Sequence, residues 1–313
     1  MSQLSPDPAL VVARPTIKTR SFHWSRDRLI SIALITPSII AVAVFVYIFI
    51  AQTAYISLVR WNDFAPDFTW VGLYNYGRLF QTERFQIDLR NTFVFTVTFI
   101  AACLALGLLL ATLLDMRIKF EALFRNIFMF PLAVSFIVTG VAWRWLETPS
   151  SGINLLFDYA GLGFLKSGWF TDPKIGILAV VLAAVWQMSG YVMAMYLAGL
   201  RGIPEELREA ARVDGATEWQ IFRRVILPLL QPITLSAVII LGHISLKIFD
   251  LTKSMTGPGP GFSSDVPALF MYDTTFSGSH FSQGASIAMV LLGLVSLLII
   301  PYLIWNFRNE VQQ

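Results

Sequence analysis

Few side chains in this sequence have a spacing that could support catalysis. The three histidines, His23, His243 and His280, are scattered, and none has a second ligand at metal-binding spacing. No Gly-x-Ser-x-Gly nucleophile motif occurs, and no lysine follows a glycine, which excludes a Gly-Lys-Ser/Thr phosphate loop. We therefore expect no catalytic residue, no metal site and no bound cofactor in this chain.

Three ionisable residues could instead line a route for a polar solute. His243, Lys247 and Asp250 occur at i, i+4 and i+7 in an apolar segment, so one helix would place them on one face. Ionisable groups inside membrane helices are costly and usually line an aqueous path. For Lys247, the equal alternative is snorkelling to the membrane interface with Asp250 as its partner. The deeper position of His243 favours the path.

A second group, Trp186, Gln187 and Tyr191, falls near the middle of another apolar segment. Aromatic rings that stack on sugar faces, beside an amide that bonds hydroxyl groups, would suit a carbohydrate path. The alternative is helix–helix packing with an interhelical amide hydrogen bond. The sequence leaves both interpretations open.

The composition places these residues in a membrane protein. The chain is 56% hydrophobic and 14% charged, outside the balance of soluble domains. Six apolar stretches are long enough to cross about 30 Å of hydrocarbon, and backbone groups in lipid must be paired, so each stretch should be a helix. The single cysteine, Cys103, should be a buried and inert side chain in the second stretch. The predicted fold is all-α and polytopic, with spans at Leu29–Ile50, Thr92–Leu114, Phe124–Leu146, Ile175–Leu200, Leu229–Phe249 and Ala285–Trp305.

The distribution of lysine and arginine predicts the orientation. Fourteen of them fall in the two terminal tails, the loop between the second and third stretches, and the segment Arg201–Pro228, against seven in the remaining loops. By the positive-inside rule, both termini and Arg201–Pro228 are cytoplasmic. This bias explains the net charge of +3 without a nucleic-acid partner. We expect a disordered tail at 1–28, one membrane domain at 29–306 and a short tail at 307–313.

The polar segment Arg201–Pro228 has the signals of two short helices. Pro204 suits the first turn of a helix, and Gly215 stands where a left-handed residue would end it. Thr217 and Gln220 form a capping box for a second helix. The final proline of the segment ends or kinks that helix before the next apolar stretch.

The first short helix could lie on the membrane or dock on a protein. Its apolar face consists of Leu207, Ala210 and Ala211, which is narrow and mostly alanine. Such a face offers little area to lipid, whereas small residues allow close approach to a protein surface. The docking interpretation is therefore favoured over a helix lying in the membrane interface.

The segment resembles the EAA loop of ABC import permeases. The resemblance rests on Glu209-Ala210-Ala211, on Gly215, and on Val225-Ile226-Leu227-Pro228, where Val225 replaces the isoleucine of the family pattern. It extends over about residues 30 to 306 and is closest to the first permease of carbohydrate-type systems. Further matching segments are Val71–Tyr76, Asn91–Phe93, Ser151–Asn154, Ala198–Leu200 and Phe249–Asp250, followed by Met255–Gly257.

The resemblance implies a permease that is not itself an enzyme. Its coupling helix would insert into a cytoplasmic ATPase dimer that holds ATP and Mg²⁺, beside a second homologous permease in the inner membrane. A sugar-binding protein would deliver a sugar or polyol from outside. The coupling residues implied are Glu209, Ala210, Ala211, Asp214, Gly215, Leu227 and Pro228.

Two other classes of protein remain as alternatives. An ion-coupled secondary carrier usually needs a carboxylate or histidine relay inside the bilayer, and the interiors of the six predicted spans contain no carboxylate. A channel or scaffold subunit of a membrane complex is the other alternative. Within the importer interpretation, a substrate other than a sugar also stays open.

Overall fold

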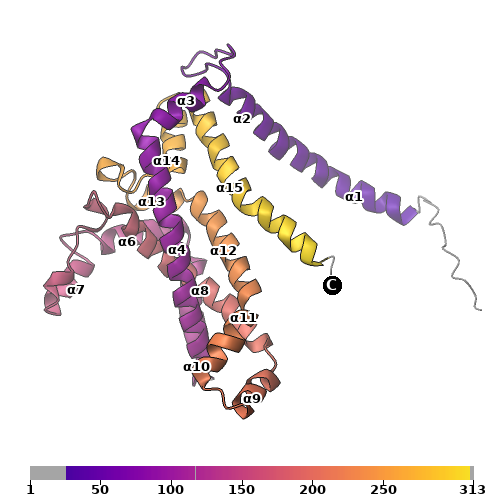
Figure 1. Ribbon diagram of the computed structural model, residues 1–313. Coiled ribbons are helices and arrows are strands. Elements are labelled where there is room, and N and C mark those ends of the chain that lie inside the picture. Colours follow the sequence, from indigo (N-terminus) through magenta and orange to yellow (C-terminus); the bar gives the residue numbers. More distant parts are fainter. Residues whose placement is uncertain (1–25, 117, 311–313) are drawn as a thin grey trace, which may run out of the picture. The chain divides into compact units, whose positions relative to one another are not determined.

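The computed structural model describes residues 26–116 and 118–310 of the chain (Figure 1). The chain divides into two compact units, Met1–Ile50 and Ala51–Gln313. Residues 1–25 of the expected first tail and 311–313 of the expected second tail lie outside the described residues. The first helix already begins at Arg26, three residues before the predicted first span.

In the first unit, α1 (Arg26–Val42) leads into a π-helical turn, η1 (Ala43–Ile48). The next helix, α2 (Phe49–Ser57), begins at the end of this unit and continues into the second. Helical structure therefore extends beyond the predicted end of the first span at Ile50. The stretch Ile30–Ser57 is long and apolar enough to cross a membrane.

The second unit is built from helices. Among the described residues, the only β pairing is an isolated bridge between Val59 and Trp70, so the predicted all-α class is confirmed. The α-helices are α3 (Tyr74–Gln81), α4 (Glu83–Asp115), α5 (Glu121–Met129), α6 (Phe136–Leu146), α7 (Ile153–Tyr159), α8 (Gly176–Gly202), α9 (Glu205–Val213), α10 (Glu218–Ile221), α11 (Leu227–Leu229), α12 (Gln231–Leu246), α13 (Asp250–Met255), α14 (Pro267–Tyr272) and α15 (Phe281–Glu310). Short 3₁₀ or π turns are η2 (Phe130–Ala133), η3 (Gly163–Leu165), η4 (Trp169–Thr171), η5 (Phe222–Ile226), η6 (Pro260–Phe262) and η7 (Asp273–Ser277).

Four continuous helices of the described chain could cross a membrane, or six spans if two bent helix pairs are each counted as one. The six match the six predicted apolar stretches, but the third and fifth are not continuous helices as expected. In the third, α5–η2 and α6 meet at 100°. The break lies at Val134, whose backbone is extended, and Ser135 then caps α6 by accepting a hydrogen bond from the Val138 amide.

The fifth span is bent by 60° at Leu230, between Pro228 and Pro232. Neither proline has an N–H to donate to the preceding helical turn, which favours a break at this position. At its far end α12 stops at Leu246, three residues before the predicted boundary, and α13 begins only at Asp250. This early end separates residues that were expected on one helix.

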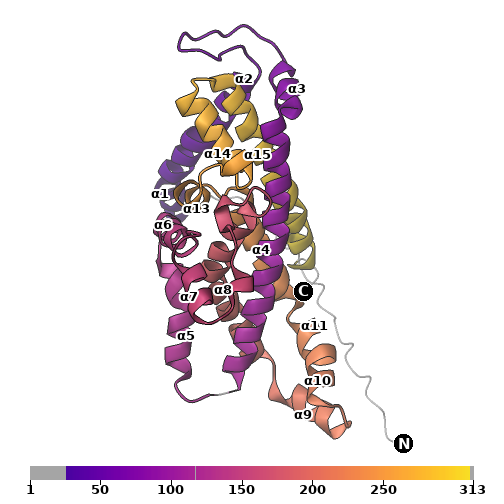
Figure 2. The same cartoon turned by 90° about the vertical axis from the view of Figure 1, so that its left-hand side faces the viewer.

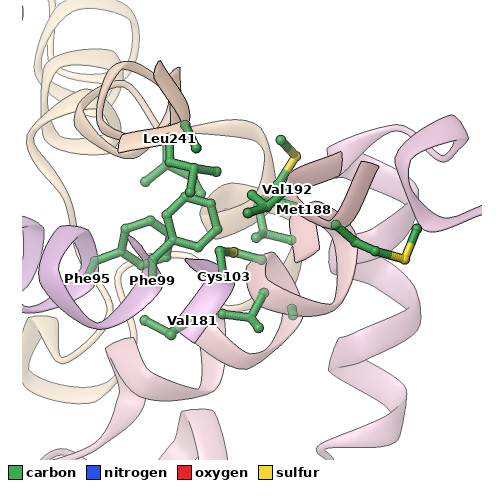
Figure 3. Packing of buried hydrophobic residues seen from close by; sticks show 14 of the residues in the cluster. Phe95, Phe99, Cys103, Val181, Met188, Val192 and Leu241 are labelled. Carbon is green, nitrogen blue, oxygen red and sulfur yellow. The ribbon is translucent and has the colours of Figure 1, made fainter. Parts of the chain in front are cut away.

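The core of the second unit is centred on α8, which packs along α4 and also contacts α5, η2, η4 and α12. Buried side chains from the three helices α4, α8 and α12 meet in Figure 3, where Phe95, Phe99, Cys103, Val181, Met188, Val192 and Leu241 are labelled. The predicted burial of Cys103 is confirmed. Gly107 allows the close contact of α4 with α8, because an added Cβ would lie 2.7 Å from the Val192 side chain.

The two ends of the second unit carry different elements. Both views show α9 and α10 at one end, and α3 and α14 at the opposite end (Figures 1 and 2). Helix α13 packs on α6, while α14 packs on α15 and α4. The polar segment Arg201–Pro228 is therefore well separated from the segment that contains α14.

Candidate functional site

Helix α9 of the polar segment ends in a Schellman motif. The amide of Ala216 donates to the carbonyl of Ala211 at 3.0 Å, and the amide of Gly215 donates to that of Arg212 at 3.0 Å. Gly215 has a φ of +79°, in the left-handed region that a residue with a Cβ avoids. Asp214 is the last residue before this glycine, at the C-cap. The predicted glycine stop is confirmed.

The second short helix, α10, begins with the predicted capping box. The Thr217 amide donates to Gln220 Oε1 at 2.8 Å, and the Gln220 amide donates to Thr217 Oγ1 at 3.4 Å. The helix then passes through the π turn η5 into α11, which contains Leu227 and Pro228. At the start of the segment Pro204 is the residue before α9 rather than part of its first turn.

The side chain of Arg208 links α9 to two core helices by hydrogen bonds. Both of its terminal nitrogens lie 3.2 Å from Asp115 Oδ2 at the end of α4, and one also donates to the Leu200 carbonyl of α8 at 3.2 Å. The side chain is only 17% exposed. No local pattern indicated this contact, because Asp115 is 93 positions away in the sequence. A second ion pair, Arg201 with Glu121 at 2.7 Å, joins α8 to α5.

An open groove of about 1190 Å³ is lined by both of these ion pairs. Water in the groove screens their charges, so the pairs add little to the free energy of unfolding. Their clearer consequence is geometric. The start of α9 is held at fixed points on α4 and α8, and the start of α5 on α8.

The outward side of α9 presents Glu209 and Ala210, which are exposed. Ala211 was expected on one face with Leu207 and Ala210, but it is half-buried and packs against the hydrophobic core, whereas Leu207 and Ala210 are exposed. Arg212 pairs with Glu218 at 2.8 Å and with Glu205 at 3.4 Å, and not with Glu209. No hydrogen bond or ion pair engages the Glu209 carboxylate within the part of the chain that the structure describes.

The side-chain amide of Gln187 forms a hydrogen bond inside the protein. Gln187 is 3% exposed, and its Nε2 donates to the Val134 carbonyl at 2.6 Å, at the break in the third span. It therefore satisfies a carbonyl that the break leaves without a helical partner. The neighbouring Trp186 is partly exposed and meets Trp143 edge-on, with 6.0 Å between ring centres. Tyr191 is half-buried against the core. A role for Trp186 and Tyr191 in a solute path stays a prediction.

The expected single face of His243, Lys247 and Asp250 does not form. Lys247 caps the end of α12 with φ −118° and ψ 22°, and the helix does not continue to Asp250. Lys247 and Asp250 are both exposed and line a pocket of about 130 Å³ with Phe136 and Phe249. His243 is not among the residues that line this pocket. The structure thus brings together two of the three predicted path residues.

An ion-pair cluster at the α14 end was not anticipated. Arg84 of α4 binds Asp265 and Asp273, and its guanidinium lies 4.5 Å from the ring centre of Phe270. Burial raises the pKa of Asp265, although the hydrogen bond from Arg84 favours its charged form. The cluster connects α4 to residues more than 180 positions later, so sequence spacing gives no sign of it.

Metal binding finds no support in the described part of the chain. No group of three or more His, Cys, Asp or Glu side chains with metal-binding geometry occurs there. The arrangement offers two surfaces for non-covalent binding: an exposed, capped helix pair at one end and a mixed aromatic and charged surface near the other.

Comparisons with known proteins give a consistent result. Residues 103–308 match the family described as binding-protein-dependent transport system inner membrane component. A probable ABC transporter permease protein of Pyrococcus horikoshii is 44% identical over 280 residues, covering 89% of this chain and 96% of that protein. The xylose/arabinose import permease protein XacH of Haloferax volcanii is 36% identical, covering 82% of each. The crystal structure of a bacterial ABC transporter involved in alginate import has a TM-score of 0.77 at 22% identity, covering 90% of this chain and 96% of that one, and supports the fold.

Proposed function

The chain belongs to the family of inner membrane components of binding-protein-dependent transport systems, and on that premise we propose that it couples a cytoplasmic ATPase to sugar import. It would be one of two related permeases in a membrane complex. ATP and Mg²⁺ would bind to the ATPase dimer, and a sugar-binding protein would deliver the substrate on the outer side. The membrane itself is a further partner, through the apolar helices described above.

The observation that carries this proposal is the construction of α9. The helix is short, is capped by the left-handed Gly215 and displays an exposed carboxylate, Glu209, that has no partner in the described chain. A carboxylate held in that way can accept a charge-assisted hydrogen bond from another protein. Exposed Ala210 beside it leaves room for the partner to approach closely.

Through Arg208, a movement of α9 would be transmitted to the helices of the membrane domain. Because its guanidinium bonds to Asp115 and to the Leu200 carbonyl, a displacement of α9 would pull on α4 and α8 together. These two helices form the centre of the core. The other end of the segment continues through α10 and α11 to the bend at Leu230. Closure of the ATPase dimer could thus move three spans at once.

A sugar is the substrate class that the relatives support best. XacH is named as a xylose/arabinose import permease, and the residues brought together at the pocket, Lys247, Asp250 and Phe249, combine charged groups with an aromatic ring. Such a combination binds hydroxyl groups and an apolar sugar face. We infer that solute passes this pocket, with Trp186 and Tyr191 as further candidates along the path.

The long helix α4 offers the ion-coupled alternative no carboxylate at its centre. In α4 the acidic residues Glu83, Asp88 and Asp115 lie near the two ends of the helix and not at its centre. A proton or sodium relay needs a carboxylate at membrane depth. This distribution favours a permease driven by ATP.

Reconstitution tests the proposal. The chain would be assembled in proteoliposomes with the second permease, ATPase and binding protein of the same transport system, and uptake of radiolabelled xylose, arabinose and maltose would be measured. We expect uptake that requires ATP, the ATPase and the binding protein together. Uptake by the permeases alone, driven by an ion gradient, would overturn the coupling function.

A further inference from the structure

A strip of aromatic rings runs from the start of α13 through α14 to η7. The ring of Phe249 lies 5.2 Å from that of Tyr272, and Tyr272 lies 5.3 Å from Phe276, measured between ring centres. Tyr272 is 37% exposed and Phe276 is 69% exposed. Phe249 also lines the pocket that contains Lys247 and Asp250. The three rings thus form a continuous surface that leads away from this pocket.

Charged side chains accompany the rings along the strip. The ammonium group of Lys253 lies 4.9 Å from the ring centre of Tyr272 and 3.4 Å from Asp273 Oδ1. The other oxygen of Asp273 accepts a hydrogen bond from Arg84 at 2.9 Å. Because Lys253 retains 44% exposure of its side chain, part of its hydrogen-bonding capacity is free for a ligand.

Contact with lipid does not account for this surface. Aromatic side chains do gather at membrane interfaces, where they anchor a helix. Here, however, the rings are interleaved with an ammonium group and a carboxylate, and Lys247 and Asp250 continue the pattern. Exposing these groups to hydrocarbon would be costly, whereas an aqueous passage would stabilise them.

Resting on the proposed import function, we propose that Phe249, Tyr272 and Phe276, with Lys253 and Asp273, form a binding strip for a neutral sugar on its way to the pocket. The apolar C–H face of a sugar ring would stack on successive aromatic rings, and its hydroxyl groups would bond to the ammonium and carboxylate groups. The positive charges of Lys247 and Lys253 are balanced by the negative charges of Asp250 and Asp273. They offer no excess charge to hold an ionic substrate.

The test uses the complete reconstituted complex and two ring deletions, Tyr272→Ala and Phe276→Ala. Uptake of xylose, arabinose and maltose below saturation would be measured, with glucuronate as an anionic probe. We expect each deletion to slow uptake of the transported neutral sugar about tenfold, as the loss of one aromatic contact would. Tyr272→Phe keeps the ring and should stay within about twofold of the unmodified complex.

Phe93→Ala is the matched control, because Phe93 is an exposed aromatic residue of α4 with 70% exposure and lies outside the strip. It should leave uptake unchanged. Normal uptake by Tyr272→Ala, or loss of the second permease from that variant's complex, would overturn the binding strip. Transport of glucuronate in place of the neutral sugars would overturn the neutral class. If the unmodified complex imports none of the four probes, the sugar function itself fails, and the strip with it.

Discussion

At the scale of single residues, substitution of Glu209 tests whether the exposed side of α9 binds the ATPase or is only solvated. Its carboxylate is exposed and has no partner in the described chain, so removing it breaks no hydrogen bond or ion pair there. A charge-assisted hydrogen bond to the ATPase would contribute about 1.5–3 kcal/mol. Glu209→Ala should therefore weaken the affinity of the ATPase by roughly ten- to a hundredfold, as co-purification at equal membrane expression would measure.

Glu206→Ala is the control for this experiment. Glu206 is also exposed on α9 and has no ion pair in the described chain, but it lies in the first turn, on the side of the open groove. Its removal should cost much less affinity. If both variants retained the ATPase equally, Glu209 would be an ordinary solvated side chain.

Arg208 should affect the transmission of force more than docking. Arg208→Ala removes the contacts of α9 with Asp115 and with the Leu200 carbonyl and leaves the Glu209 surface in place. We expect the ATPase to bind and to hydrolyse ATP, while the amount of sugar imported per ATP falls about fivefold or more, comparable to other couplings between sites. The measurement is the ratio of uptake to hydrolysis in proteoliposomes.

Arg212→Ala provides the comparison. In the described chain Arg212 pairs with Glu205 and Glu218, which belong to the same polar segment, so its loss removes no described ion pair with α4 or α8. The ratio of uptake to hydrolysis should stay close to that of the unmodified complex. An equal fall in both variants would show that Arg208 has no special part in coupling.

At the scale of elements, Gly215 should be essential for aligning α9 with α10. A Cβ at this position would meet no atom within 4 Å, so Gly215→Val introduces backbone strain and no clash. The left-handed conformation costs a residue with a Cβ about 1–2 kcal/mol, and more when it is β-branched. The protein should reach the membrane, but ATPase association and sugar uptake should fall sharply.

Gly161→Val introduces the same strain elsewhere. Gly161 has a φ of +72°, and a Cβ added there would also meet no atom within 4 Å. It lies in the loop after α7, outside the polar segment Arg201–Pro228. Both variants should lose similar thermal stability, and only Gly215→Val should lose coupling. Near-normal uptake by Gly215→Val would contradict the assignment of α9 as the coupling helix.

Features of these elements that depend on neighbouring residues could be predicted from the sequence, whereas contacts between residues far apart in the sequence could not. The Gly215 stop and the capping box of Thr217 and Gln220 depend on residues within a few positions of each other, so their spacing was sufficient. The break at Val134 is satisfied by Gln187, which lies 53 positions later, and hydropathy alone predicted an unbroken helix there. The bond from Arg208 to Asp115 was missed for the same reason.

At the scale of the whole molecule, the positions of the apolar stretches were predictable, and their breaks and packing were not. Hydropathy reports transfer of a segment into lipid, which depends on composition, so the six stretches were found. The central position of α8 follows from small residues and complementary side chains, such as Gly107 against Val192. A residue at i+7 from His243 was expected on the same face, but Asp250 belongs to another helix because α12 ends early.

The energy source is the property of the whole molecule that separates an ATP-driven importer from an ion-coupled carrier. In the long helix α4 the carboxylates lie near the ends, and the pocket residues Lys247 and Asp250 are exposed rather than buried as a relay would be. Sugar uptake by cells should therefore persist when an uncoupler collapses the proton gradient, provided that cellular ATP is held constant. The measurement is radiolabelled sugar uptake with parallel assays of ATP and membrane potential. Loss of uptake at unchanged ATP would restore the ion-coupled carrier as the better interpretation, because only that mechanism draws directly on the gradient.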